Sequence, residues 1–189
     1  MKDDKYYIER VIQGDVNAFS YIVEKHKNLV YTIALRIVRN PEDAEELAQD
    51  TFIKAFNSLK DFKFESKFST WLYRITYNGS ISKLRKKQIE IADIENDSIY
   101  EGDVVSSYNA ISELKRDEQK KYINLVLDQL KEDDAFLITM YYLNENSIEE
   151  ISEITELSLS NVKVKLHRAR KKFYDVLKVM LKEEVKAII

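Results

Sequence analysis

Residues 40–87 of the chain read NPEDAEELAQDTFIKAFNSLKDFKFESKFSTWLYRITYNGSISKLRKK. Asn40 is a favourable N-cap residue, and Pro41 suits the first turn of a helix, where a missing N–H has no partner to lose. The apolar residues that follow recur at helical spacing, so this segment predicts an amphipathic helix. Its expected inward face consists of Ala44, Leu47, Ala48, Phe52, Ala55 and Leu59. After an aromatic turn, a second and increasingly basic helix is expected from Thr70 to about Lys87.

The regions on either side also favour helices. The chain has 189 residues but only three Gly and one Pro, whereas strand-rich folds need turn residues at regular intervals. A short helix is expected from about Lys5 to Gln13, and Asp15 is a plausible N-cap for a longer one. Apolar residues at three- and four-residue spacing between Ala18 and Ile37 form one buried stripe. These patterns predict an all-α fold.

His26 falls on this apolar stripe. A single histidine there is more often a packed, hydrogen-bonded side chain than a metal ligand, and no His and Cys cluster accompanies it. The chain has no cysteine, which excludes disulfides and thiolate metal sites. It also lacks a nucleophile–base pairing and a Gly-rich phosphate loop. We therefore expect no enzyme activity, no metal and no cofactor.

Charge divides the chain into segments, although the net charge is only −3. Between Lys87 and Lys115 there are acidic residues but no Lys or Arg, and basic residues cluster on either side. The predicted organisation is a first domain over residues 1–88, a flexible acidic linker over 89–112 and a second domain over 113–189. No apolar signal-peptide core or membrane-spanning run occurs, so a cytoplasmic protein is expected.

The second domain is expected to end in a helix-turn-helix. Helices are predicted from about Asp117 and from about Glu132 to Leu143, followed by a capping box at Ser147–Glu150. Ser158 can cap a long last helix, whose predicted inward residues are Leu159, Val162, Leu166, Ala169, Phe173, Val176 and Leu177. Its outer face is polar and basic, which suits either solvent or a DNA groove.

Two surfaces in residues 40–87 have alternative interpretations. The acidic outer face of the first helix can be solvated, or it can bind a basic partner. Aromatic and basic residues alternate on the second helix, which suits single-stranded nucleic acid because bases stack on rings while cations hold phosphates. Trp and Tyr in a small helical bundle are also commonly core residues, and we expect Trp71 to be one.

Three stretches carry a family resemblance: DAEELAQDTFIKAF (Asp43–Phe56), FSTWLYRITYN (Phe68–Asn78) and SIEEISEITELSLSNVKVKLHRARKKF (Ser147–Phe173). In this order and spacing, the chain resembles bacterial RNA polymerase sigma factors of the extracytoplasmic-function (ECF) group of the sigma-70 family. Glu156 stands where this family usually has Gly in the helix-turn-helix turn, and Lys165 stands where Arg is common.

The resemblance implies a sigma factor that binds core RNA polymerase and directs promoter-specific initiation. The helix after Pro41 would dock on the clamp coiled coil of the largest subunit, and the second domain would sit on the flap of the second-largest subunit. The implied polymerase-binding residues are Asp43, Glu46, Gln49, Asp50 and Ile53. An anti-sigma factor is an expected further partner, whereas no small-molecule substrate or membrane embedding is expected.

The resemblance also implies two promoter contacts. The aromatic turn at Lys60–Ser69 and the helix after it would melt the −10 element and hold an extruded base. The implied −10 residues are Lys63, Phe64, Lys67, Tyr73, Arg74, Tyr77, Asn78, Lys83, Arg85 and Lys86. The last long helix would enter the major groove at the −35 element. The implied −35 residues are Ser160, Asn161, Lys163, Val164, Lys165, His167, Arg168 and Lys171.

Two other functions remain open at this point. A stand-alone helix-turn-helix regulator would explain the second domain but would leave residues 40–87 without a role. A protein-interaction adaptor would need no DNA contact. Binding to core polymerase separates the sigma factor from the regulator, and DNA binding separates either of them from the adaptor.

Overall fold

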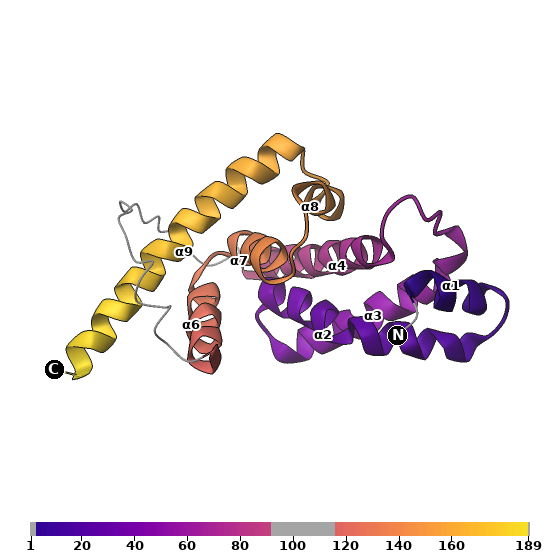
Figure 1. The fold of residues 1–189 in the computed structure, drawn as a ribbon, viewed down its shortest axis with the longest axis horizontal. Coiled ribbons are helices and arrows are strands. Elements are labelled where there is room, and N and C mark those ends of the chain that lie inside the picture. Colours follow the sequence, from indigo (N-terminus) through magenta and orange to yellow (C-terminus); the bar gives the residue numbers. More distant parts are fainter. Residues whose placement is uncertain (1–2, 92–115, 189) are drawn as a thin grey trace. The chain divides into compact units, whose positions relative to one another are not determined.

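The computed structural model describes residues 3–91 and 116–188, and every regular element in them is helical (Figure 1). This confirms the all-α class. The chain forms two compact units. The first contains α1 to α4 together with residues Glu149–Leu157, and the second contains α6, α7, a π-helix and α9. Residues 149–157 therefore group differently from the predicted domain boundaries. Most of the predicted linker lies outside the described residues.

The first unit is built on three helices that all contact one another: α2 (Phe19–Val38), α3 (Pro41–Asn57) and α4 (Phe68–Ile91). Helix α1 (Asp4–Ile12) and two short 3₁₀ turns, η1 (Val16–Ala18) and η2 (Leu59–Asp61), complete it (Figure 1). The predicted stripe of α2 is largely buried, and so are most of the predicted inward residues of α3. Burial of these apolar side chains is the main stabilising contribution to the unit.

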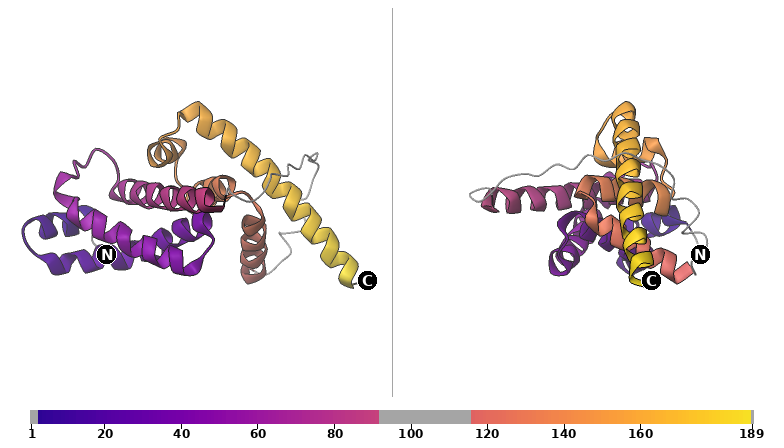
Figure 2. Two further views of the ribbon diagram at one scale, coloured as in Figure 1. Left: turned by 180° about the vertical axis from the view of Figure 1, so that it is seen from behind. Right: turned by 90° about the vertical axis from the view of Figure 1, so that its left-hand side faces the viewer.

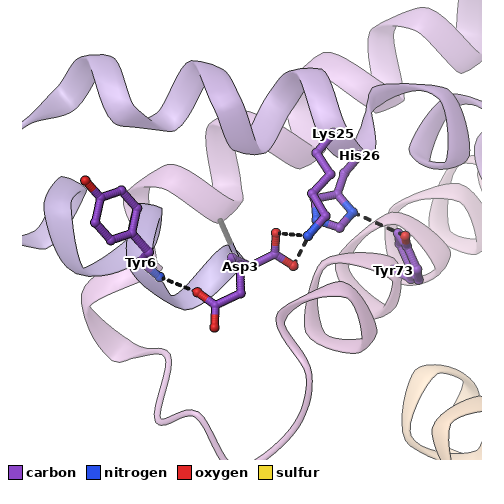
Figure 3. Close-up of polar contacts among 6 residues, drawn as sticks. Asp3, Tyr6, Lys25, His26 and Tyr73 are labelled. Atoms are coloured by element: carbon purple, nitrogen blue, oxygen red, sulfur yellow. Dashed lines mark hydrogen bonds and ion pairs between the residues drawn. The ribbon is translucent and has the colours of Figure 1, made fainter. Parts of the chain in front are cut away.

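Side-chain caps fix where two of these helices begin. The Oδ1 atom of Asn40 accepts a hydrogen bond from the backbone N–H of Asp43 at 2.9 Å, which confirms the predicted cap of α3. Asp3 caps α1 in the same way, accepting from the N–H of Tyr6 at 3.0 Å (Figure 3). The predicted cap at Asp15 is wrong. Its side chain makes no capping bond and pairs with Arg10, while α2 begins at Phe19 after a 3₁₀ turn.

Helix α4 buries polar residues that the sequence pattern did not mark as inward. Thr76 and Ser80 are both fully buried. Their hydroxyls donate to the carbonyls of Leu72 and Thr76, at 3.0 and 2.8 Å. Because each hydroxyl finds its acceptor one turn earlier in the same helix, it can be buried without an unsatisfied group. Helix α4 therefore packs against α2 and α3, although its buried and exposed faces differ little in hydrophobicity.

The second unit consists of α6 (Arg116–Gln129), α7 (Glu132–Ile138), a π-helix (Thr139–Leu143) and α9 (Leu159–Ile188). Figure 2 shows α9 as one continuous helix, and it contacts both α6 and α7. The buried residues include Leu127, Phe136, Met140, Val162, Leu166, Ala169 and Leu177. Leu159 was predicted to point inward but is 44% exposed, because it is the first residue of α9 and lies outside the packed part of the helix.

The predicted turn between α8 (Ile148–Thr155) and α9 is present. Ser158 caps α9, since its Oγ accepts from the N–H of Asn161 at 3.3 Å. Glu156 adopts a left-handed conformation with φ of 60°. A residue with a Cβ pays roughly 1–2 kcal/mol for this conformation, which explains why glycine suits such a turn. Among the described residues, no helix is long and apolar enough to cross a membrane.

Candidate partner-binding and nucleic-acid-binding surfaces

The outward face of α3 forms the first candidate surface, which we call the α3 acidic face. It consists of the predicted polymerase-binding residues Asp43, Glu46, Gln49, Asp50 and Ile53. Ile53 is 58% exposed, although it is a large apolar residue, and Gln49 and Asp50 are exposed beside it. An exposed apolar side chain surrounded by acidic and polar groups is suited to a partner that has both a basic and an apolar contact region.

Two members of the α3 acidic face are tied to α4 by Lys83. The Lys83 Nζ lies 2.8 Å from Asp43 Oδ1 and 2.6 Å from Glu46 Oε2. The hydrogen bonds that Lys83 donates to Asp43 and Glu46 raise the pKa of Lys83. Lys83 was predicted to contact −10 DNA. In this structure its ammonium group instead joins α3 to α4.

The turn between α3 and α4 separates buried from exposed aromatic rings. Phe62 and Phe68 are buried, and both rings pack against the half-buried Trp71, with centroids 5.2 and 5.5 Å away. Phe64 is 41% exposed and has a left-handed backbone, with φ of 59°. Lys63 and Lys67 are exposed in the same turn. The turn therefore presents one exposed aromatic ring between two exposed cations.

The solvent-facing side of α4 contains most of the remaining predicted −10 residues. Arg74, Asn78, Arg85 and Lys86 are exposed, and Tyr77 is half-buried. Like Lys83, two further predicted −10 cations have acidic partners in this unit. Arg74 donates from Nε and Nη2 to Glu156 Oε1 at 3.1 and 2.6 Å, and Lys67 Nζ lies 2.7 Å from Glu150 Oε1. A DNA phosphate would have to replace these carboxylates.

The buried position of Tyr73 differs from the predicted one. Tyr73 was expected on a DNA-facing side of α4, but it is only 5% exposed. Its hydroxyl lies 3.3 Å from Nδ1 of the buried His26 in α2 (Figure 3). The sequence could not reveal this, because the partner that holds Tyr73 inward lies 47 residues earlier in the chain. The expectation that His26 is a packed and hydrogen-bonded side chain is confirmed.

Asp4 completes this buried network and was missed in the sequence. Its Oδ2 lies 3.2 Å from His26 Nε2, and its Oδ1 accepts from Lys25 Nζ at 2.7 Å. Burial alone would raise the pKa of the Asp4 carboxyl, but its hydrogen bonds and electrostatic interactions with the His26 and Lys25 side chains outweigh burial, so the pKa is lowered. The network joins α1, α2 and α4.

Burial of Tyr73 makes stability depend on pH in the alkaline range. Burial, followed by the charges of Asp4 and Glu150, raises the pKa of Tyr73 from 10.0 to about 12. The unfolded chain therefore loses this proton first as the pH rises, and the free energy of unfolding falls by up to about 3 kcal/mol between pH 10 and pH 12. Tyr73→Phe should reduce this fall, measured by urea unfolding at both pH values. An identical fall in both proteins would contradict the assignment.

The outward face of α9 forms the third surface. Ser160, Asn161, Lys163, Val164, His167, Arg168 and Lys171 are all exposed there, as predicted. They lie opposite the buried residues Val162, Leu166 and Ala169. Lys165 is half-buried, and its Nζ lies 3.1 Å from Asp133 Oδ2. The face combines cations with the exposed apolar side chain of Val164, so it can contact both phosphates and base edges.

The described residues contain no group of three or more His, Cys, Asp or Glu side chains that could hold a metal ion. The three surfaces instead consist of exposed cations, carboxylates, amides and aromatic rings. Their chemistry is that of binding to macromolecules.

In a comparison with known proteins, two protein-family models match separate parts of the chain. Residues 22–89 match the model of Sigma-70 region 2, and residues 120–173 match that of Sigma-70, region 4. The chain is 34% identical over 175 residues to the ECF RNA polymerase sigma factor SigW of Bacillus subtilis (strain 168), covering 88% of this chain and 92% of SigW. It is 30% identical to the ECF RNA polymerase sigma-E factor of Escherichia coli (strain K12), covering 88% and 90%.

Solved structures show the same fold. CnrH, in complex with the cytosolic domain of CnrY, aligns with a TM-score of 0.63 at 21% identity, covering 93% of this chain and 97% of that chain. RpoE from Bartonella quintana, in complex with the anti-sigma factor NepR, also aligns with a TM-score of 0.63, at 24% identity, covering 85% and 97%. The two family matches and the identity to SigW show that the chain belongs to the ECF group of the sigma-70 family of RNA polymerase sigma factors.

Proposed function

We propose that this sigma factor binds core RNA polymerase through the α3 acidic face and recognises promoters through its two other surfaces. The exposed Ile53, beside Gln49 and Asp50, is the observation that supports docking most directly. A large apolar side chain exposed on a charged face is typical of an interface centre. The proposed partner region is the clamp coiled coil of the largest subunit, and the second unit is proposed to bind the flap of the second-largest subunit.

The turn with Phe64 and the exposed side of α4 are proposed to melt the −10 element. Extruding a base from duplex DNA costs a few kcal/mol, which stacking on an aromatic ring offsets. Phe64 provides such a ring, and Lys63 and Lys67 provide cations for neighbouring phosphates. Tyr73 is excluded from this role, because its side chain is buried and its hydroxyl faces His26.

The outward face of α9 is proposed to read the −35 element in the major groove. Arginine commonly reads guanine through two hydrogen bonds, and a good base contact of this kind contributes roughly 1–3 kcal/mol of discrimination. Lys165 is a single point charge held near Asp133, which suits a phosphate contact better than bidentate reading.

Arg168→Ala should lower transcription about tenfold from a promoter with an intact −35 element, because a base contact is lost. The measurement is run-off transcription with core polymerase. At a promoter with a scrambled −35 element, the variant should change transcription little. Lys120→Ala is the control, since Lys120 is an exposed cation of the same unit but belongs to α6 rather than to the outward face of α9. An equal loss at both promoters would contradict the groove-reading role.

An anti-sigma factor is a proposed regulatory partner. The structures of CnrH and Bartonella quintana RpoE are complexes with CnrY and with the anti-sigma factor NepR, respectively. Both align over most of this chain, so a comparable inhibitory protein fits the same fold. We propose that the protein acts in the cytoplasm, where core polymerase is found, and that it has no catalytic activity of its own.

The decisive experiment combines pull-down with in vitro transcription. The full chain should co-purify with core RNA polymerase and support specific initiation from a promoter library, which would also reveal the preferred −10 and −35 sequences. A stand-alone helix-turn-helix regulator would bind duplex DNA but would neither co-purify with core polymerase nor initiate transcription. That outcome would overturn the proposed function.

A further inference from the structure

Helix α1 (Asp4–Ile12) lies outside residues 22–89, which match the Sigma-70 region 2 model. It is nevertheless an integral part of the first unit. Ile8 is fully buried, and α1 contacts both α2 and η2, the 3₁₀ turn that begins the segment between α3 and α4. The 3₁₀ turn that ends three residues before the proposed base-holding ring of Phe64 therefore packs against a helix that the family match does not include.

The buried network fixes the first turn of α1. The Asp4 carboxylate contacts Lys25 and His26 of α2. His26 in turn contacts Tyr73 of α4 (Figure 3). His26 and Tyr73 are each 5% exposed, so the contact between them is shielded from water, whereas the Asp4 contacts lie nearer the surface. Because Asp4 is anchored to α2, the backbone of its neighbour Lys5 is held in a defined place at the surface.

Lys5 lies at the exposed ring of the turn. Its Nζ is 5.8 Å from the centroid of the Phe64 ring, within the range of a cation–π interaction. The Lys5 side chain is 64% exposed, and its ion pair with Glu9 is long, at 3.9 Å. Phe64 has a left-handed backbone, a conformation that is costly for a residue with a side chain and that occurs preferentially at functional sites. An exposed and weakly paired cation and an exposed ring are therefore placed together.

We propose that Lys5 is a further single-stranded-DNA-binding residue and forms one platform with Phe64. An unstacked base of the melted promoter strand stacks on the exposed ring, while the Lys5 ammonium group contacts an adjacent phosphate. This inference rests on the proposed function, because it deepens the role of the turn that holds the −10 strand. It extends the binding surface to α1, beyond the residues that the family resemblance implied.

The test is a binding titration with full-length protein in complex with core polymerase. The probe is a fluorescein-labelled non-template-strand oligonucleotide, carrying the −10 element of a promoter selected by the transcription experiment, and binding is followed by anisotropy. Lys5→Ala should weaken binding about fivefold, since one phosphate contact beside an aromatic ring is lost. Lys5→Arg, which keeps the charge and can also stack on the ring, should bind within about twofold of wild type.

Two controls separate the platform from general electrostatic attraction. Lys27→Ala should leave binding unchanged, because Lys27 is also an exposed lysine with one carboxylate partner, Glu24, but belongs to α2. The second control is a double-mutant cycle with Phe64→Ala. If Lys5 acts through the platform, Lys5→Ala should have less than about half of its free-energy effect in the Phe64→Ala background, since contacting residues are not additive.

The remaining outcomes distinguish an error in the role of Lys5 from an error in the proposed function. Binding by Lys5→Ala equal to wild type, with a clear loss in Phe64→Ala, would overturn the role of Lys5 and leave the proposed function intact. Equal effects of Lys5→Ala in both backgrounds would overturn the shared platform, because Lys5 would then act as a distant charge. If the wild-type complex fails to initiate at any promoter, the proposed function itself is wrong.

Discussion

Asp50→Lys is expected to weaken binding to core RNA polymerase about 100-fold, which corresponds to about 2.7 kcal/mol. Asp50 is exposed on the α3 acidic face, beside the exposed Ile53. Reversing its charge would place a cation opposite a basic partner, and like charges facing each other across an interface cost several kcal/mol. The fold should be unaffected, because the Asp50 side chain is exposed. The measurement is a fluorescence binding titration with core polymerase, supported by circular dichroism of the variant.

Glu45→Lys is the matched control for this prediction. It makes the same change of charge type on the same helix, and Glu45 is also exposed. Five residues separate the two positions, so the Glu45 side chain points about 140° away from that of Asp50. Its effect on polymerase affinity should be much smaller. If both variants bind equally weakly, the net charge of the protein determines polymerase affinity rather than the position of Asp50 on the α3 acidic face. If Asp50→Lys binds like wild type, the docking assignment is wrong.

Trp71→Ala should lower the free energy of unfolding of the first unit by about 2–3 kcal/mol. Its indole packs against the buried rings of Phe62 and Phe68, which also contact each other. Truncating a large aromatic residue in a packed core costs roughly 3–5 kcal/mol, and the half-buried position of Trp71 reduces that figure. A loss of this size is a large fraction of the stability of a typical domain.

Hydrogen exchange of the buried α2 amides is the appropriate measurement, because it reports on the first unit separately from the second. Fluorescence cannot be used for the comparison, since Trp71 is the only tryptophan in the chain. Phe64→Ala is the control in the same turn: its ring is exposed, so the loss should be below about 1 kcal/mol. Unchanged protection of α2 in Trp71→Ala would show that Trp71 is not a core residue.

The parts of this structure that could be predicted from sequence depend on short-range patterns. Asn40 and Pro41 predicted the start of α3, because N-capping involves only residues two or three apart. The inward face of α3 and the outward face of α9 followed from helical spacing, because both helices have a clear apolar side. The same spacing placed Asp50 and Arg168 on exposed faces, where the structure has them.

The parts that could not be predicted depend on contacts between distant segments. Tyr73 is buried where its hydroxyl meets His26, and Asp4 contacts His26 from the first turn of α1. Thr76 and Ser80 are buried but polar, so the spacing of apolar residues on α4 gave no sign of which side packs inward. Lys83 was grouped with the basic residues before Lys87, whereas its partners lie in α3. In these cases the residue type indicated which contacts a side chain could make, but not whether the side chain faces the protein interior, another helix or solvent.

The position of Lys83 has a thermodynamic consequence for the two surfaces that it joins. Any partner that binds the carboxylates of Asp43 and Glu46 must compete with the ammonium group of Lys83. Any phosphate that binds Lys83 must likewise compete with those two carboxylates. Such competition is a coupling free energy, and linkage requires it to be reciprocal. Occupation of the α3 acidic face would therefore make Lys83 more available to DNA, and DNA bound at Lys83 would favour occupation of α3 by the same factor.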